Sequence, residues 1–148
     1  MQIQPAGTSP IACDRIDHFV LTVASIEATC DFYSRVLGMK VVQFESMGTR
    51  RVALAFGQQK INLHAADAVP DPNVLKPMPG SADFCLITSA PLADFRAHLA
   101  NEHVEVILGP VLRTGATGRI ESVYFRDPDM NLVEVANYLP AEALRAPA

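Results

Sequence analysis

The chain has 148 residues, 49% of them apolar and 19% charged, with a formal net charge of −4. This length suits one domain with a substantial core, and the apolar content argues against intrinsic disorder. A weakly acidic chain without a basic run is not expected to bind nucleic acid, and no apolar run approaches the length of a membrane span.

Cysteine usage and the N-terminal residues indicate the compartment. Cys13, Cys30 and Cys85 are odd in number and lack CxxC spacing, which argues against a disulfide framework or a cysteine zinc site. Residues 1–14 read as a loose arm without the charged and apolar regions of a signal peptide. We therefore expect a reduced, cytoplasmic protein.

The first regular segment is a strand over residues 16–23, IDHFVLTV, in which His18 shares one face with every second residue. Ser25 is placed to cap a following helix, and Gly38 is placed to end it. A strand and then a helix are therefore expected at the start of the domain.

Three further strands complete the first half of the chain. Residues 39–45 form the first, and residues 51–56 and 60–65 form a hairpin around the turn GQQ. In the last strand Asn62 and His64 share a face, because side chains two residues apart point the same way.

The proline-rich residues 66–81 read as a linker, and after them the pattern begins again. A strand over residues 82–88 precedes a helix with Pro91 at its first position. A strand over residues 104–108, a glycine-rich loop and a hairpin over residues 122–135 follow.

The order β-α-β-β-β therefore occurs twice, which predicts an α+β fold built from two βαβββ modules. The repeat aligns His18 with Asp83 and His64 with Glu134. The expected division of the single domain is module one 15–66, linker 67–81, module two 82–138 and tail 139–148.

Glu134 is unusual because it is a carboxylate in the middle of an apolar strand, after the turn DPDMN. It either lies in water on an edge strand or faces an enclosed cavity beside a cation or donor. If each module forms half of a barrel-shaped cleft, the aligned positions converge there. Two imidazoles and a carboxylate suit a divalent metal, with Glu134 also able to act as a base and Asp83 as a fourth ligand or an orienting partner.

Several segments carry a family resemblance: IDHFVLTV, DFYSRVLGMKV, FGQQKINLH, GSADFCLIT, RTGATG and SVYFRDPDMNLVEV. Together they resemble the vicinal oxygen chelate family, which includes glyoxalase I, extradiol dioxygenases and bleomycin-resistance proteins, and especially its glyoxalase domain-containing protein 5 subgroup. The resemblance implies one divalent metal ion (Zn, Ni, Fe, Mn or Co) on His18, His64 and Glu134, with Asp83 at the fourth position. Met130 stands where such proteins usually have glycine.

Further polar residues are candidates for contacts with a substrate. Arg113 either lies exposed or clamps a substrate carboxylate. Tyr124 and Ser122 share a strand face, from which the Tyr124 phenol would donate to a substrate oxygen unless it is a plain wall residue. His98 and His103 are interpreted as solvated residues on or just after the second helix.

Three functions fit these residues. The leading one is a metal-dependent glyoxalase-like lyase or isomerase acting on a small substrate chelated through vicinal oxygens, in which Glu134, with Asp83, moves the proton. The alternatives are an extradiol ring-cleaving dioxygenase using Fe(II), and a metal-free drug- or metabolite-binding protein of the bleomycin-resistance type.

The expected assembly is a homodimer. Relatives with two modules commonly complete the site across chains, and the linker is long enough for that. His18 and His64 would then come from one chain, and Asp83 and Glu134 from the other. The open alternative is a site built within one chain.

Overall fold

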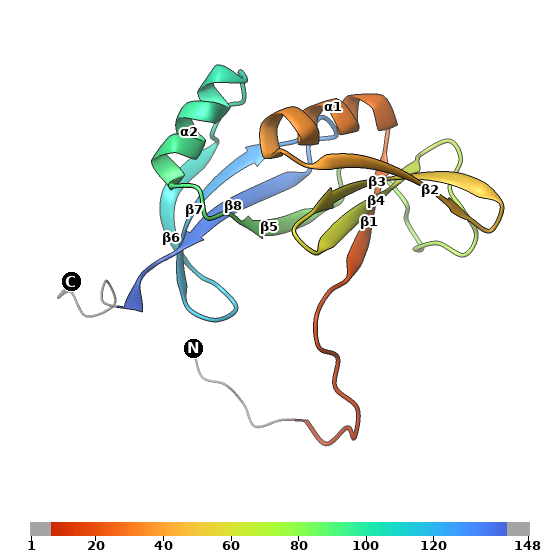
Figure 1. Cartoon of the computed structure of the whole chain (residues 1–148), viewed down its shortest axis with the longest axis horizontal. Helices are drawn as coiled ribbons and strands as arrows, with labels where there is room; N and C mark the ends of the chain where they lie inside the picture. Colours follow the sequence, from red (N-terminus) through yellow and green to blue (C-terminus); the bar gives the residue numbers. More distant parts are fainter. Residues whose placement is uncertain (1–6, 142–148) are drawn as a thin grey trace.

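The computed structural model describes residues 7–141, so the predicted N-terminal arm and C-terminal tail lie partly outside the described residues. Two modules follow one another along the chain, each with one helix and four strands (Figure 1). Module one comprises β1 (His18–Val23), α1 (Ile26–Leu37), β2 (Lys40–Ser46), β3 (Thr49–Phe56) and β4 (Gln59–Ala65). Module two comprises β5 (Asp83–Ile87), α2 (Leu92–Asn101), β6 (Leu108–Thr114), β7 (Arg119–Arg126) and β8 (Leu132–Tyr138).

Each module folds into its own mixed sheet. The strand orders are β1-β4-β3-β2 and β5-β8-β7-β6, with the first and last strand of each module parallel and the other neighbours antiparallel. The predicted α+β fold of two βαβββ modules is confirmed. Neither helix within residues 7–141 has the length and apolar character needed to cross a membrane.

Both helices lie on the same side of the two sheets, which leaves the opposite faces uncovered (Figure 1). The alternation along β1 shows this, since Leu21 is 3% exposed on the helix side and Val20 is 41% exposed on the other. One continuous core lies under the helices and spans both modules, with Phe125 of β7 packed against Phe32 of α1 and Phe95 of α2. We call the uncovered side of each sheet its open face.

The two predicted ends of α1 are present. The Ser25 hydroxyl accepts a hydrogen bond from the Ala28 backbone at 3.1 Å, which satisfies one free N–H of the first turn. Gly38 adopts the left-handed conformation with φ of 66°, and its N–H bonds back to the last turn of the helix.

The third strand of module two differs from the prediction. Residues 104–107 are not a strand, and β6 instead occupies Leu108–Thr114, most of which was predicted to be loop. Gly109 has φ of 118°, and the pairing of β6 with β7 shifts between Leu108 and Val111. An edge strand tolerates Gly-Pro at such a bulge, because no further strand needs its backbone groups.

The turn between β7 and β8 fastens the two modules together. The Asp127 carboxylate, which is 4% exposed, accepts hydrogen bonds from the Tyr33 hydroxyl of α1 at 2.7 Å, from the Asp129 backbone, and from the backbone and side chain of Asn131. The Asn131 side chain in turn accepts a bond from the Ala82 backbone at 2.9 Å. A local turn motif therefore also ties α1, the end of the linker and module two into one unit.

A second link joins the helices. The Nε2 atom of His98 on α2 lies 3.1 Å from the carbonyl oxygens of Arg35 and Val36 at the end of α1, and Arg35 also pairs with Glu102 at 2.7 Å. The interpretation of His98 as a solvated helix residue is therefore wrong. Its imidazole lies within hydrogen-bond distance of backbone carbonyl groups that have no partner within α1 because they are in its last turn. His103 is exposed, as expected.

Candidate functional site

The strand register corrects the alignment of the two modules. Val20 lies opposite Asn62 in module one, and Cys85 lies opposite Glu134 in module two. Because His18 and Asp83 each precede these positions by two residues, the counterpart of Glu134 is Asn62. The alignment of His64 with Glu134 is wrong.

The register also separates the two predicted histidine ligands. His18 lies opposite Lys60, whereas His64 lies opposite Thr22, four residues further along β1. With a rise of about 3.3 Å per residue and about 4.8 Å between strands, their Cα atoms are roughly 14 Å apart. Two imidazoles at that spacing do not reach one ion, and association with another chain does not change the spacing within this sheet. Sheet geometry therefore does not support His18, His64 and Glu134 as one ligand set.

His18 is held in an orientation that suits a metal ligand. Its Nδ1 atom lies 2.8 Å from the Asp17 carboxylate, which leaves Nε2 free. The hydrogen bond to His18 lowers the pKa of Asp17 below its ordinary value. A carboxylate on the second ring nitrogen is the usual partner of a metal-binding imidazole.

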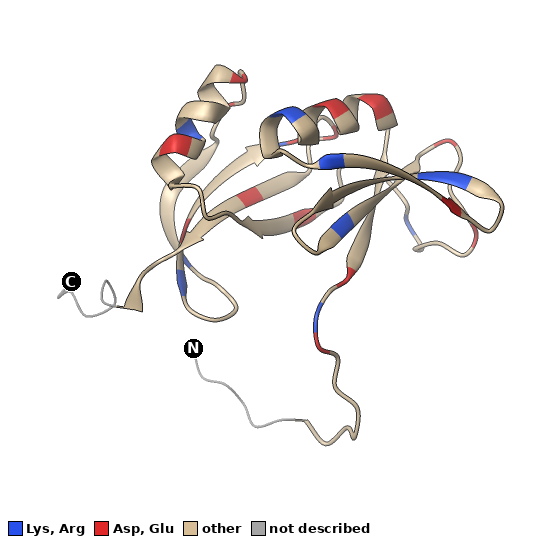
Figure 2. Ribbon diagram, in the orientation of Figure 1, with Lys and Arg blue, Asp and Glu red and all other residues tan. Residues whose placement is uncertain are grey.

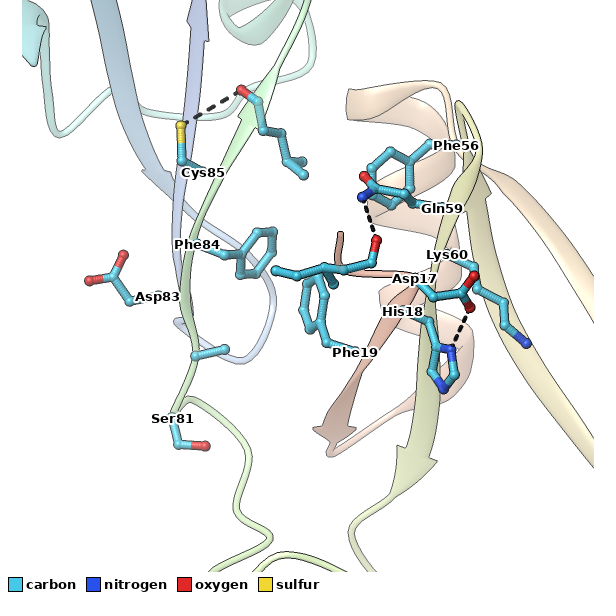
Figure 3. Close-up of a pocket in the computed structure, with 13 residues that line it drawn as sticks. Asp17, His18, Phe19, Phe56, Gln59, Lys60, Ser81, Asp83, Phe84 and Cys85 are labelled. Atoms are coloured by element: carbon cyan, nitrogen blue, oxygen red, sulfur yellow. Dashed lines mark hydrogen bonds and ion pairs between the residues drawn. The ribbon is translucent and has the colours of Figure 1, made fainter. Parts of the chain in front are cut away.

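His18 and Asp83 lie on either side of the seam between the modules (Figure 3). The rings of Phe19 and Phe84 meet between them at 5.1 Å, beside a cavity of about 590 Å³. The side chains of His18 and Asp83 point apart in this view. Across residues 7–141, no three His, Cys, Asp or Glu side chains come close enough to hold one ion.

On the open face of each module, two polar residues lie diagonally to each other on the first and last strands. These diagonal pairs are His18 with Asn62 in module one and Asp83 with Glu134 in module two. Asn62 Oδ1 and Glu134 Oε1 are both buried and have no hydrogen-bond partner among the described residues. An unsatisfied buried oxygen is unfavourable, and coordination of a cation would relieve it. One imidazole nitrogen with carboxylate and amide oxygens is a donor set that fits a divalent ion.

Glu134 lies at the centre of the open face of module two. Cys85 on β5 and Tyr124 on β7 are directly opposite it on either side, at a cavity of about 350 Å³. Burial, and then the Glu134 carboxylate, raises the pKa of Cys85 to about 12, so the thiol stays protonated. The carboxylate therefore has a protonated thiol on one side and a phenol on the other.

Tyr124 and Arg113 form a pair at the same cavity. The Arg113 Nε donates to the Tyr124 hydroxyl at 3.0 Å, so Arg113 lies on β6 and faces the site. Burial chiefly raises the pKa of Tyr124, and the Glu134 carboxylate adds to this. Tyr124 is therefore a protonated phenol with a hydrogen to donate.

Ser122 does not reach this cavity. It is fully buried at the pairing of β7 with Ala136 of β8, and its hydroxyl has no hydrogen-bond partner in the described part of the chain. The structure gives it no accessible surface with which to contact a substrate, contrary to the prediction.

His64 occupies a different environment from His18. Burial, and then the positive charge of Arg51, lowers the pKa of His64 below its ordinary value. Its imidazole is therefore neutral near pH 7, and it faces a separate cavity of module one. The sequence did not lead us to name Asn62, Asp17 or Arg51 as candidate site residues. Aligning the modules on their buried strand positions would have revealed Asn62.

Comparison with known proteins agrees with this architecture. A family model described as the glyoxalase/bleomycin resistance protein/dioxygenase superfamily matches residues 15–135. The chain belongs to this superfamily. The resemblance to vicinal oxygen chelate proteins is thus confirmed at the level of the superfamily.

Three relatives are similar to this chain over most of its length. Virulence protein STM3117 of Salmonella typhimurium is 49% identical over 126 residues, 85% of each protein. Its crystal structure matches with a TM-score of 0.83 and 48% identity, covering 87% of this chain and 100% of that one. An integron cassette protein from the mobile metagenome of V. cholerae matches with a TM-score of 0.82 and 49% identity over 87% and 98% of the two chains. Glyoxalase domain-containing protein RDO1 of Mycosarcoma maydis is 48% identical over 127 residues, 86% of this chain and 70% of that protein.

Proposed function

We propose that this protein is a metal-dependent enzyme of the lyase or isomerase type, acting on a small molecule bound through two neighbouring oxygens. The observation that supports this is the pair of repeat-equivalent diagonals, His18 with Asn62 and Asp83 with Glu134, each with a buried oxygen that lacks a partner. Membership of the superfamily adds to it, and we place the protein in the glyoxalase domain-containing protein 5 subgroup on the motifs given above.

The proposed ligands are His18 Nε2, Asn62 Oδ1 and the carboxylates of Asp83 and Glu134. A bound divalent ion (Zn, Ni, Fe, Mn or Co) would supply Lewis acidity that polarises the substrate oxygens. Asp17 holds the His18 ring so that Nε2 stays available.

The proton chemistry belongs to module two. Glu134 accepts the proton from the carbon beside the substrate oxygens and returns it to the neighbouring carbon. Tyr124 donates its hydroxyl hydrogen to the substrate oxygen that gains negative charge, and Arg113 holds the phenol in place. Asp83, diagonal to Glu134, helps to move the proton.

The proposed active form is a homodimer in which the open face of module one meets the open face of the partner's module two. Within one chain His18 and Asp83 point apart, and the core and turn contacts hold the modules side by side (Figure 3). Val20 and Ile87 leave apolar surface exposed on the two open faces, at 41% and 53%. Joining two copies through these faces would cover that surface and bring the two diagonals together.

The ligand geometry favours this chemistry over Fe(II) ring cleavage. Extradiol dioxygenases use two histidines and one carboxylate at one ion. The register separates His18 from His64 and leaves one imidazole among the proposed ligands. A metal-free binding protein is distinguished by the experiment below.

Metal binding tests the ligand set. Protein purified without chelators is expected to contain about one divalent ion per chain by elemental analysis, as a four-ligand site predicts. His18→Ala should weaken metal binding in calorimetry by more than about 100-fold, and Asp17→Asn by about 10- to 100-fold, because Asp17 acts through the His18 ring. His64→Ala is the matched control, since it removes the same side chain from the same face and should leave the affinity unchanged.

The results of these measurements distinguish the proposed ligand set and function from their alternatives. Equal loss in His64→Ala and His18→Ala would contradict the register-based ligand set. A metal-free protein that still binds small organic molecules would favour the bleomycin-resistance type of function.

A further inference from the structure

The separate cavity that His64 faces has a volume of about 200 Å³ and lies on the open face of module one, away from the seam. β2, β3 and β4 form its floor, and the proline-rich segment between the modules covers one side. Its lining residues are Phe44, Ser46, Met47, Arg51, Val52, Asn62, Leu63, His64, Pro70, Asp71 and Pro72. The mechanism above uses Asn62 alone among them.

Arg51 is the unusual member of this lining. Its side chain is half-buried, yet it forms no ion pair and no hydrogen bond with any described residue. Arg35 pairs with Glu102 and Arg113 bonds to Tyr124, whereas the other arginines without a side-chain partner in the described structure, Arg50, Arg96 and Arg119, are exposed to water. A guanidinium carries a fork of N–H donors that matches a carboxylate or phosphate, and here that fork faces a cavity.

The rest of the cavity complements a negative group. His64 comes opposite Arg51 when the pairing of Val52 with Leu63 is continued by one residue, and its buried Nδ1 has no partner in the described structure. Lys60 is not part of this lining, but its ammonium lies 4.0 Å from the centre of the Phe44 ring on the same face of the sheet. In Figure 2, Lys and Arg positions are blue on β4 and on the β2–β3 hairpin.

Asp71 is the carboxylate of the lining. It is exposed on the covering segment, and no ion pair joins it to Arg51 among residues 7–141. The guanidinium therefore remains available to an external anion.

We propose that this cavity binds an anionic oxygen group of the substrate, a carboxylate or a phosphate, through Arg51 and His64. The inference rests on the proposed function, because Asn62 belongs both to this cavity and to the proposed ligand set. Asn62 and His64 are two residues apart on β4, so the anionic group lies about 7 Å from the position of the chelated oxygens. The substrate class is thus a small acid that carries its vicinal oxygens a few bonds from its carboxylate or phosphate.

Binding of simple anions to metal-free protein tests this cavity separately from the metal site. The probes are malonate, succinate and inorganic phosphate, and malonamide and succinamide are the neutral counterparts. Binding is measured by calorimetry and by the ¹H–¹⁵N NMR chemical shift changes of residues in β3 and β4. The wild type should bind at least one anion saturably and neither amide. Arg51→Leu should weaken that binding about 10- to 100-fold, the loss expected when a hydrogen bond to a charged group is removed.

The matched control is Arg50→Leu, which removes the same charge from the adjacent, exposed position on the other face of β3. It should leave anion binding within about twofold. Arg51→Lys keeps the charge but loses the forked N–H donors of the guanidinium. Its anion affinity should lie between those of the wild type and Arg51→Leu. His64→Gln provides a second variant if Arg51→Leu does not fold, and it should also weaken binding.

The proposed anion site is contradicted if no anion binds. It is also contradicted if Arg50→Leu and Arg51→Leu weaken binding equally, since nonspecific electrostatic attraction to the positively charged side chains of the protein would then explain the binding. Preference for the carboxylates or for phosphate identifies the group. Arg51→Leu should retain the metal affinity of the wild type, so failure of the anion site and failure of the metal site give different results.

Discussion

Mixing His18→Ala protein with Glu134→Ala protein is expected to restore metal sites that neither variant has alone. If each site takes His18 and Asn62 from one chain and Asp83 and Glu134 from the other, a mixed dimer has one intact site and one doubly damaged site. Random exchange of equal amounts makes half of the dimers mixed, so about one quarter of the sites should return. Elemental analysis after gel filtration measures the recovery, and turnover should return in the same proportion.

A chain with both substitutions provides the control. After exchange with an equal amount of wild type, every mixed dimer would have two damaged sites, and the intact fraction should fall from one half to about one quarter. A site within one chain would stay at one half. Verified exchange without recovery in the first mixture would show that each chain builds its own site.

The second large effect is expected at the turn that fastens the modules. Asp127→Ala should lower the free energy of unfolding by about 3 to 5 kcal/mol, because it leaves buried donors from three residues without an acceptor. Those donors belong to Tyr33, Asp129 and Asn131. Urea unfolding followed by circular dichroism measures the change.

A graded series identifies the cause. Tyr33→Phe removes one of these hydrogen bonds and should lower the free energy of unfolding by about 1 to 2 kcal/mol. Asp94→Ala, in the exposed first turn of α2, should change it by less than about 0.5 kcal/mol. If Asp127→Ala proved no worse than Asp94→Ala, the turn would be a local feature without a role in joining the modules.

The sequence by itself determined the order of the elements and the repeat. Alternating apolar residues indicated most strands, Ser25 and Gly38 indicated the ends of α1, and the two βαβββ units followed from their order. These features depend on residues close together in the chain, so local pattern is sufficient to predict them. The placement of His18 and Glu134 on strand faces was predictable for the same reason.

Tertiary structure decided how the modules correspond and what each polar residue faces. The β3–β4 turn spans residues 57–58, whereas the β7–β8 turn spans residues 127–131, so counting through the turns misaligned His64 with Glu134. Hydrogen bonds between strands fix the register, and they made Asn62 the counterpart of Glu134. Asp127 and His98 also each have a partner in α1 that lies at least 60 residues away, and no local pattern encodes contacts formed only when the helices pack over a shared core.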